Sequence, residues 1–110
     1  MASAFKTATS ADVGTSLTTS YTCPANTTST IIGLYLCNQS GGQIEATAQF
    51  YDASETNHIS MINSSPIPSG STLVLVGGDG KVVCEAGDKI KVQSNVASSI
   101  DVVLSYLEQT

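Results

Sequence analysis

Short β-rich runs recur along this chain about every ten residues, and turn-forming residues separate them. The runs span residues 16–22, 30–38, 43–52, 58–62, 72–76, 81–84, 89–94 and 100–108. This spacing leaves little room for a helix and is typical of a sandwich or a barrel. It predicts an all-β fold, a compact antiparallel β-sandwich of about eight short strands that is jelly-roll-like.

Two stretches of the chain depart from this pattern. Residues 1–14 carry small and polar side chains without a period, so we expect an N-terminal arm there that becomes ordered against a partner. The β-sandwich domain is then expected over residues 15–110. Residues 66–70 contain two prolines, which cannot donate to a central ladder, and are expected to form a fixed loop. The arm residues expected to contact the partner are Ala2, Ser3, Phe5, Lys6 and Asp12.

The alternation of apolar residues differs between strands. Residues 44–52 alternate apolar with polar side chains, which predicts one buried and one wet face. Residues 31–37, 73–76 and 100–107 are apolar on both faces, and a two-layer domain covers only one of them. The surplus face is expected to meet another subunit, or else the arm or a long loop. The expected oligomer face contains Ile31, Tyr35, Val74, Val76, Val103 and Leu107.

Charge and composition exclude several partners. The chain has 4 lysines and no arginine against 9 acidic residues, which is too few cations to neutralise a phosphate backbone, so no nucleic-acid partner is expected. The longest apolar runs have about four residues, where a membrane span needs about 20, and no secretory leader is expected either.

Residue types that carry chemistry are few and scattered. Cys23, Cys37 and Cys84 are widely spaced without a CxxC motif, which favours free thiols over disulfides or zinc. A site with a cysteine and His58 can be drawn, but no protease or hydrolase signature accompanies it. The glycine-rich turn at 77–80 lacks the P-loop pattern, and the acidic turn at 85–88 lacks calcium-binding spacing. We therefore expect no catalytic residue, no cofactor and no metal.

Five segments together resemble small virion structural proteins of tailed phages, notably phages of cyanobacteria and marine bacteria. They are residues 20–25 (SYTCPA), 31–38 (IIGLYLCN), 66–71 (PIPSGS), 83–92 (VCEAGDKIKV) and 100–105 (IDVVLS), and the resemblance covers nearly the whole chain. The motifs mark turns and corners of a β-sandwich and do not mark an active site.

The resemblance implies a structural, non-enzymatic role. It implies a capsid decoration or cement protein that binds and stabilises the assembled head, with the major capsid protein as partner and a homotrimer as the favoured state. The implied location is the capsid surface of a virion, after synthesis in the host cytoplasm. A neck or tail adaptor, a tail-fibre module that binds a receptor or carbohydrate, and a small hydrolase remain alternatives.

Overall fold

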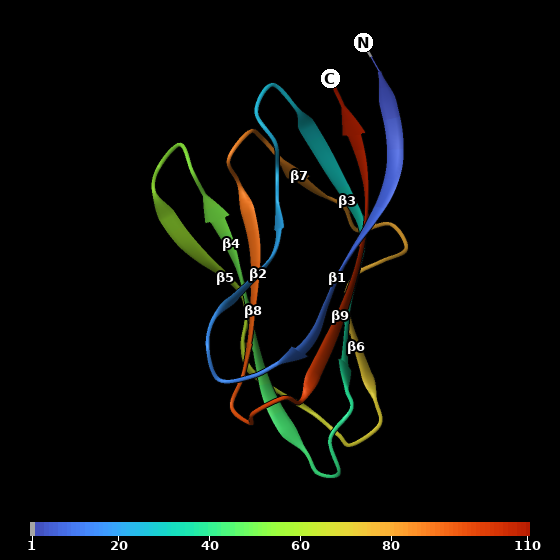
Figure 1. The fold of residues 1–110 in the computed structure, drawn as a ribbon, viewed down its shortest axis with the longest axis vertical. Coiled ribbons are helices and arrows are strands. Elements are labelled where there is room, and N and C mark those ends of the chain that lie inside the picture. The colour runs from blue at the N-terminus through green and yellow to red at the C-terminus, as the bar shows by residue number, and fades with distance from the viewer. Residues whose placement is uncertain (1) are drawn as a thin grey trace.

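The fold consists of two antiparallel sheets packed face to face (Figure 1), and the computed structural model describes residues 2–110. Sheet A contains, in order, β1 (Ser3–Val13), β9 (Ile100–Gln109), β3 (Thr28–Asn38) and β6 (Thr72–Val76), and β7 (Val82–Cys84) also pairs with β3. Sheet B contains, in order, β2 (Thr18–Thr22), β8 (Lys89–Ser94), β4 (Ile44–Asp52) and β5 (Asn57–Ile67). This order is that of a jelly roll, so the predicted all-β sandwich is confirmed. Within residues 2–110, no helix is long and apolar enough to cross a membrane.

The core lies between the two sheets and is built from alternate residues of each strand. On β4, Ile44, Ala46 and Ala48 are buried while Glu45 is exposed, as the alternation predicts. Leu34 and Leu104 of sheet A are fully buried in the same core. Burying each such large aliphatic side chain contributes about 1.5–3 kcal/mol.

The segment that we expected to be an arm is a strand of the domain. Residues 3–13 form β1, which pairs with β9 from Ser3 opposite Gln109 to Ser10 opposite Val102. Of β1 only Val13 is buried, because β1 lies at the edge of its sheet and buries little on either face. The strand therefore shows no apolar alternation, and the sandwich has nine strands instead of eight. Met1, which the expected arm included, lies outside the described residues.

Two bulges change which side chains of sheet A face outward. The register of β3 against β9 shifts between Ile31 and Gly33, and this turns Ile31 into the core on the same side as Leu34. The register of β3 against β6 shifts as well, so that Val76 is buried while Val74 is exposed. Ile31 and Val76 are therefore core residues, contrary to our placement of them on an exposed oligomer face.

Strand β5 extends further than the sequence predicts. It continues through Pro66, which pairs with Glu45, to Ile67, which pairs with Ile44. Proline is tolerated here because β5 is the edge of sheet B, where one row of backbone N–H groups has no partner strand. The expected loop over residues 66–70 therefore begins only after Ile67.

Candidate functional site

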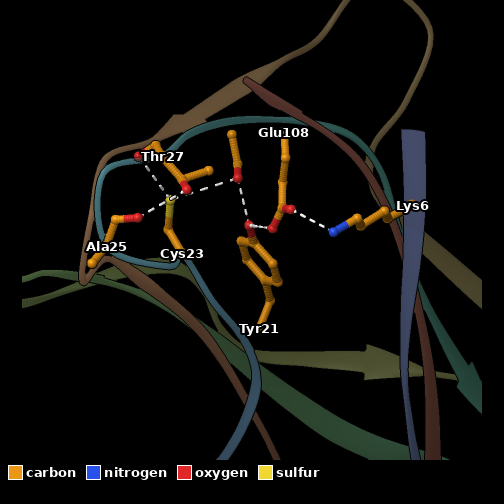
Figure 2. A network of polar contacts seen from close by, with 7 residues as sticks. Lys6, Tyr21, Cys23, Ala25, Thr27 and Glu108 are labelled. Atoms are coloured by element: carbon orange, nitrogen blue, oxygen red, sulfur yellow. Dashed lines mark hydrogen bonds and ion pairs between the residues drawn. The ribbon is translucent and has the colours of Figure 1, made fainter. Parts of the chain in front are cut away.

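A chain of polar contacts joins the two sheets near the ends of the polypeptide (Figure 2). Tyr21 of sheet B donates its hydroxyl proton to Glu108 Oε2 of sheet A at 3.0 Å, and the same hydroxyl contacts Ser29 Oγ. Lys6 Nζ donates to Glu108 Oε1 at 2.8 Å, which ties the edge strand β1 to β9. Burial raises the pKa of Tyr21, so its hydroxyl remains protonated. This cluster fastens β1 and the sheets together and contains no activated nucleophile.

The cysteine thiols are free. Cys23 and Cys84 are buried and Cys37 is half-buried. Burial, with a smaller contribution from Cys23 and Asp88, raises the pKa of Cys84 to about 12. The Cys84 thiol is therefore protonated and inert at neutral pH.

The single histidine lies on β5, which pairs with β4, and neither of these strands carries a cysteine. His58 is exposed on the edge strand β5, and its ring packs on Tyr51 with ring centroids 4.8 Å apart. Within residues 2–110, no hydrogen bond joins His58 to a serine, threonine or cysteine, and no group of three acids, cysteines or histidines is placed to hold a metal. A shallow polar pocket of about 190 Å³ on sheet B contains no histidine or cysteine; it is lined by Glu45, Thr47, Ser64, Gln93, Ser94 and Asn95.

The outer face of sheet A carries an apolar surface. The register aligns Thr9, Val103, Tyr35 and Val74 in one row across the sheet, and Phe5, Leu107, Thr30 and Val83 in a second. Phe5 is 76% exposed, the largest exposed fraction among these apolar residues. Of the expected oligomer face, Tyr35, Val74, Val103 and Leu107 lie on this surface. Of the expected arm residues, Phe5 lies on it too.

The remaining arm residues have separate positions. Ser3 begins β1, and the carbonyl of Ala2 accepts a hydrogen bond from the backbone N–H of Thr110 at 2.9 Å. Lys6 forms the ion pair with Glu108. Asp12 lies at the bulge near the end of β1 with a positive φ of 56°. Its backbone N–H donates to Asp101 Oδ1 at 3.0 Å.

The two long sheet edges were not apparent in the sequence. β1 and β5 each have 11 residues, whereas the other two edge strands of the main sheet order, β2 and β6, have 5 each. Proteins commonly shield long edges with prolines, bulges or outward lysines. Residues 3–10 of β1 contain no proline or bulge, and their single lysine is paired with Glu108.

Comparison with known proteins finds a structural similarity and no match by sequence. No family model matches the chain, and no curated protein matches it. A solved structure from Bacillus endospore appendages, described as a novel family of disulfide-linked pili, is similar with a TM-score of 0.59 and 12% sequence identity. The match covers 98% of this chain and 88% of that chain. At this identity the similarity concerns the fold alone.

The comparison overturns the phage interpretation. The full-length similarity is to a pilus protein, so the expected membership among virion proteins, the decoration function and the capsid location are wrong, and nothing supports a capsid protein as partner. The physical reason lies in the motifs themselves. The proline and glycine corners and the acidic turn specify bends between strands, and any sandwich with the same bends can carry them.

Proposed function

We propose that this protein is a structural subunit that polymerises with copies of itself into an extracellular, pilus-like filament of the kind found on spores. The observation that carries the proposal is the pair of long unpaired edges, β1 in sheet A and β5 in sheet B. The similarity to a spore appendage protein supports it. No catalytic group is required for this role.

The two long edges lie at diagonally opposite corners of the sandwich. β1 lies over β2, and β5 lies near β6. At each side of the sandwich, a long edge strand of one sheet therefore lies against a short edge strand of the other sheet. Pairing β1 of one copy with β5 of the next uses two different surfaces. Such a heterologous contact leaves one free edge at each end of the growing chain, and it produces an open filament when the rotation between copies does not close a ring. This architecture replaces the trimer that we expected from the sequence.

The apolar outer face of sheet A supports the same role. Tyr35, Val74, Val103 and Leu107 remain the residues that we propose for a second contact between copies, because exposed apolar rows of this extent mark interaction surfaces. Strand pairing would form the filament, and this face would join neighbouring filaments or turns.

A charged side chain on the edge tests the strand contact. We expect Thr7→Lys in β1 to raise the critical concentration for filament formation at least about tenfold, because an edge lysine opposes strand addition. Electron microscopy and sedimentation of the purified protein give the measurement. Wild-type protein that stays monomeric at high concentration under all conditions would refute the function.

The matched control is Ser105→Lys. Ser105 pairs directly with Thr7 but lies on the inner strand β9. It therefore lies on the same face of sheet A as Thr7 but not on the edge strand. Filaments that tolerate lysine at 105 and not at 7 identify the edge as the contact. Equal suppression by both variants would assign assembly to the face of sheet A instead.

A further inference from the structure

Two lysines and the only histidine gather around one aromatic ring on the outer face of sheet B. Tyr51 pairs with His58 on one side and with Lys89 on the other, so the three side chains form one row across β5, β4 and β8. Lys89 Nζ lies 5.7 Å and Lys91 Nζ 5.1 Å from the centre of the Tyr51 ring. We call Tyr51, His58, Lys89 and Lys91 the basic patch.

The basic patch is unusual in a protein with a net charge of -5. The other two lysines are engaged within the domain: Lys6 pairs with Glu108, and Lys81 Nζ donates to the Gly78 carbonyl at 2.6 Å. The one ion pair within residues 2–110 involves neither Lys89 nor Lys91. The ring of Tyr51 attracts both ammonium groups by cation–π interaction, and within residues 2–110 neither group forms an ion pair with a carboxylate.

Two aspartates, which match the two lysines in number of charges, lie at the other end of the molecule, on sheet A. Asp12 is the last residue but one of β1 and Asp101 is the second residue of β9, and the backbone N–H of Asp12 donates to the Asp101 carboxylate. Gln39 Nε2 donates to the carboxylates of both residues. No lysine of residues 2–110 forms an ion pair with either aspartate. The corner formed by Asp12 and Asp101 therefore presents two negative charges held in a fixed arrangement.

We propose that the basic patch of one copy attracts the Asp12–Asp101 corner of the next copy across the shared strand edge. The inference rests on the proposed function and adds the direction of strand pairing. If β1 runs antiparallel to the β5 of its neighbour, the Asp12 end of β1 lies beside Asn57 and His58. A parallel arrangement would bring Asp12 to the Ile67 end of β5, away from the basic patch. Charge complementarity selects the antiparallel arrangement.

The test reverses one charge on each side. At low ionic strength, Lys91→Glu and Asp101→Lys should each raise the critical concentration for assembly severalfold, and the double variant should recover most of that loss. Lys81→Glu and Asp79→Lys are the controls, because both are exposed turn residues outside the two surfaces and change the net charge equally. Asp12→Asn is a further variant that removes a charge while asparagine still accepts the positive φ. Circular dichroism and thermal unfolding show that each variant is folded.

The outcomes separate this inference from the proposed function. Wild-type filaments whose assembly falls with Lys91→Glu, and is restored in the double variant, support the pairing. Wild-type filaments that respond to Lys91→Glu no more than to Lys81→Glu overturn the pairing and leave the polymer intact. The same holds when the double variant shows only the sum of the two single losses. A wild-type protein that forms no filament refutes the function itself.

Discussion

Glu108 lies near one end of the sandwich, and its side chain is only 11% exposed. Burial alone would raise its pKa, but the hydrogen bond from Lys6, followed by that from Tyr21, holds the pKa below the ordinary value of 4.5. The same contact raises the pKa of Lys6. The ionised form of Glu108 is therefore favoured in the folded protein over the unfolded chain.

This shift predicts a dependence of stability on pH. Because the pKa is lowered by folding, the contribution of Glu108 is fully present above about pH 4.5 and is lost as the pH falls through the lower folded value. Glu108→Gln removes the charge and can still accept the hydrogen bond from Tyr21. We expect the wild type to be more stable than Glu108→Gln at neutral pH, and the difference to shrink below pH 4.5 in urea unfolding experiments. The exposed Glu55→Gln is the control, and a difference that stays constant down to pH 2 would contradict the assignment.

At the scale of elements, Asn38 fixes how β3 is connected to its neighbours. Its fully buried side chain donates to the carbonyls of Gly42 and Ile67, both at 2.8 Å. Its Oδ1 accepts hydrogen bonds from the N–H and the hydroxyl of Ser40. One amide thus shapes the turn that leads into β4 and also binds the end of β5 in the opposite sheet.

Truncating this amide should destabilise the fold more than ordinary loop substitutions do. Asn38→Ala leaves the buried Ile67 carbonyl without this partner and removes the hydrogen bonds to Gly42 and Ser40, and we expect a loss of about 2–4 kcal/mol in the free energy of unfolding. The control is Asn95→Ala, since the exposed Asn95 accepts one hydrogen bond, from Glu45 N–H, and should cost about 1 kcal/mol or less. Chemical denaturation measures both. Equal losses would show that the buried network around Asn38 contributes nothing beyond a single exposed bond.

Elements with one wet face could be predicted from the sequence, and elements at edges and bulges could not. The alternation of β4 identified its buried residues because apolar and polar positions differ clearly there. β1 gave no such signal, since a strand that is exposed on both faces needs no alternation. The bulges after Ile31 and before Val76 depend on neighbouring strands, so counting by twos along the chain assigned both residues to the wrong face.

The candidate site was less predictable than the fold. Lysine and histidine positions were visible in the sequence, but their meeting around Tyr51 depends on the pairing of β4 with both β5 and β8. The open edges of β1 and β5 follow from the order of strands in each sheet, which involves contacts between distant parts of the chain. Local patterns report which residues form strands and carry little information on which strands remain at the edge.

At the scale of the whole molecule, the cysteines distinguish this chain from disulfide-linked pili. Cys23 and Cys84 are buried and Cys37 is only partly accessible, so this fold offers poor access for covalent links between copies. We therefore expect filaments of this chain to persist in reductant, because the proposed strand pairing and charge attraction require no disulfide. They should also run as monomers on a non-reducing denaturing gel. A ladder of oligomers that collapses on reduction, and is lost in Cys37→Ser, would contradict this prediction.

The two ends of the chain lie side by side, where Ser3 pairs with Gln109 (Figure 1). A pulling force applied between these ends would open β1 from β9 like a zipper, with one pair of residues carrying the load at a time. A load transmitted through strand contacts between copies would instead be shared by many hydrogen bonds at once. The tensile strength of a filament built from this subunit would therefore reside in its open edges, and an anchor attached at either terminus would be its mechanically weakest point.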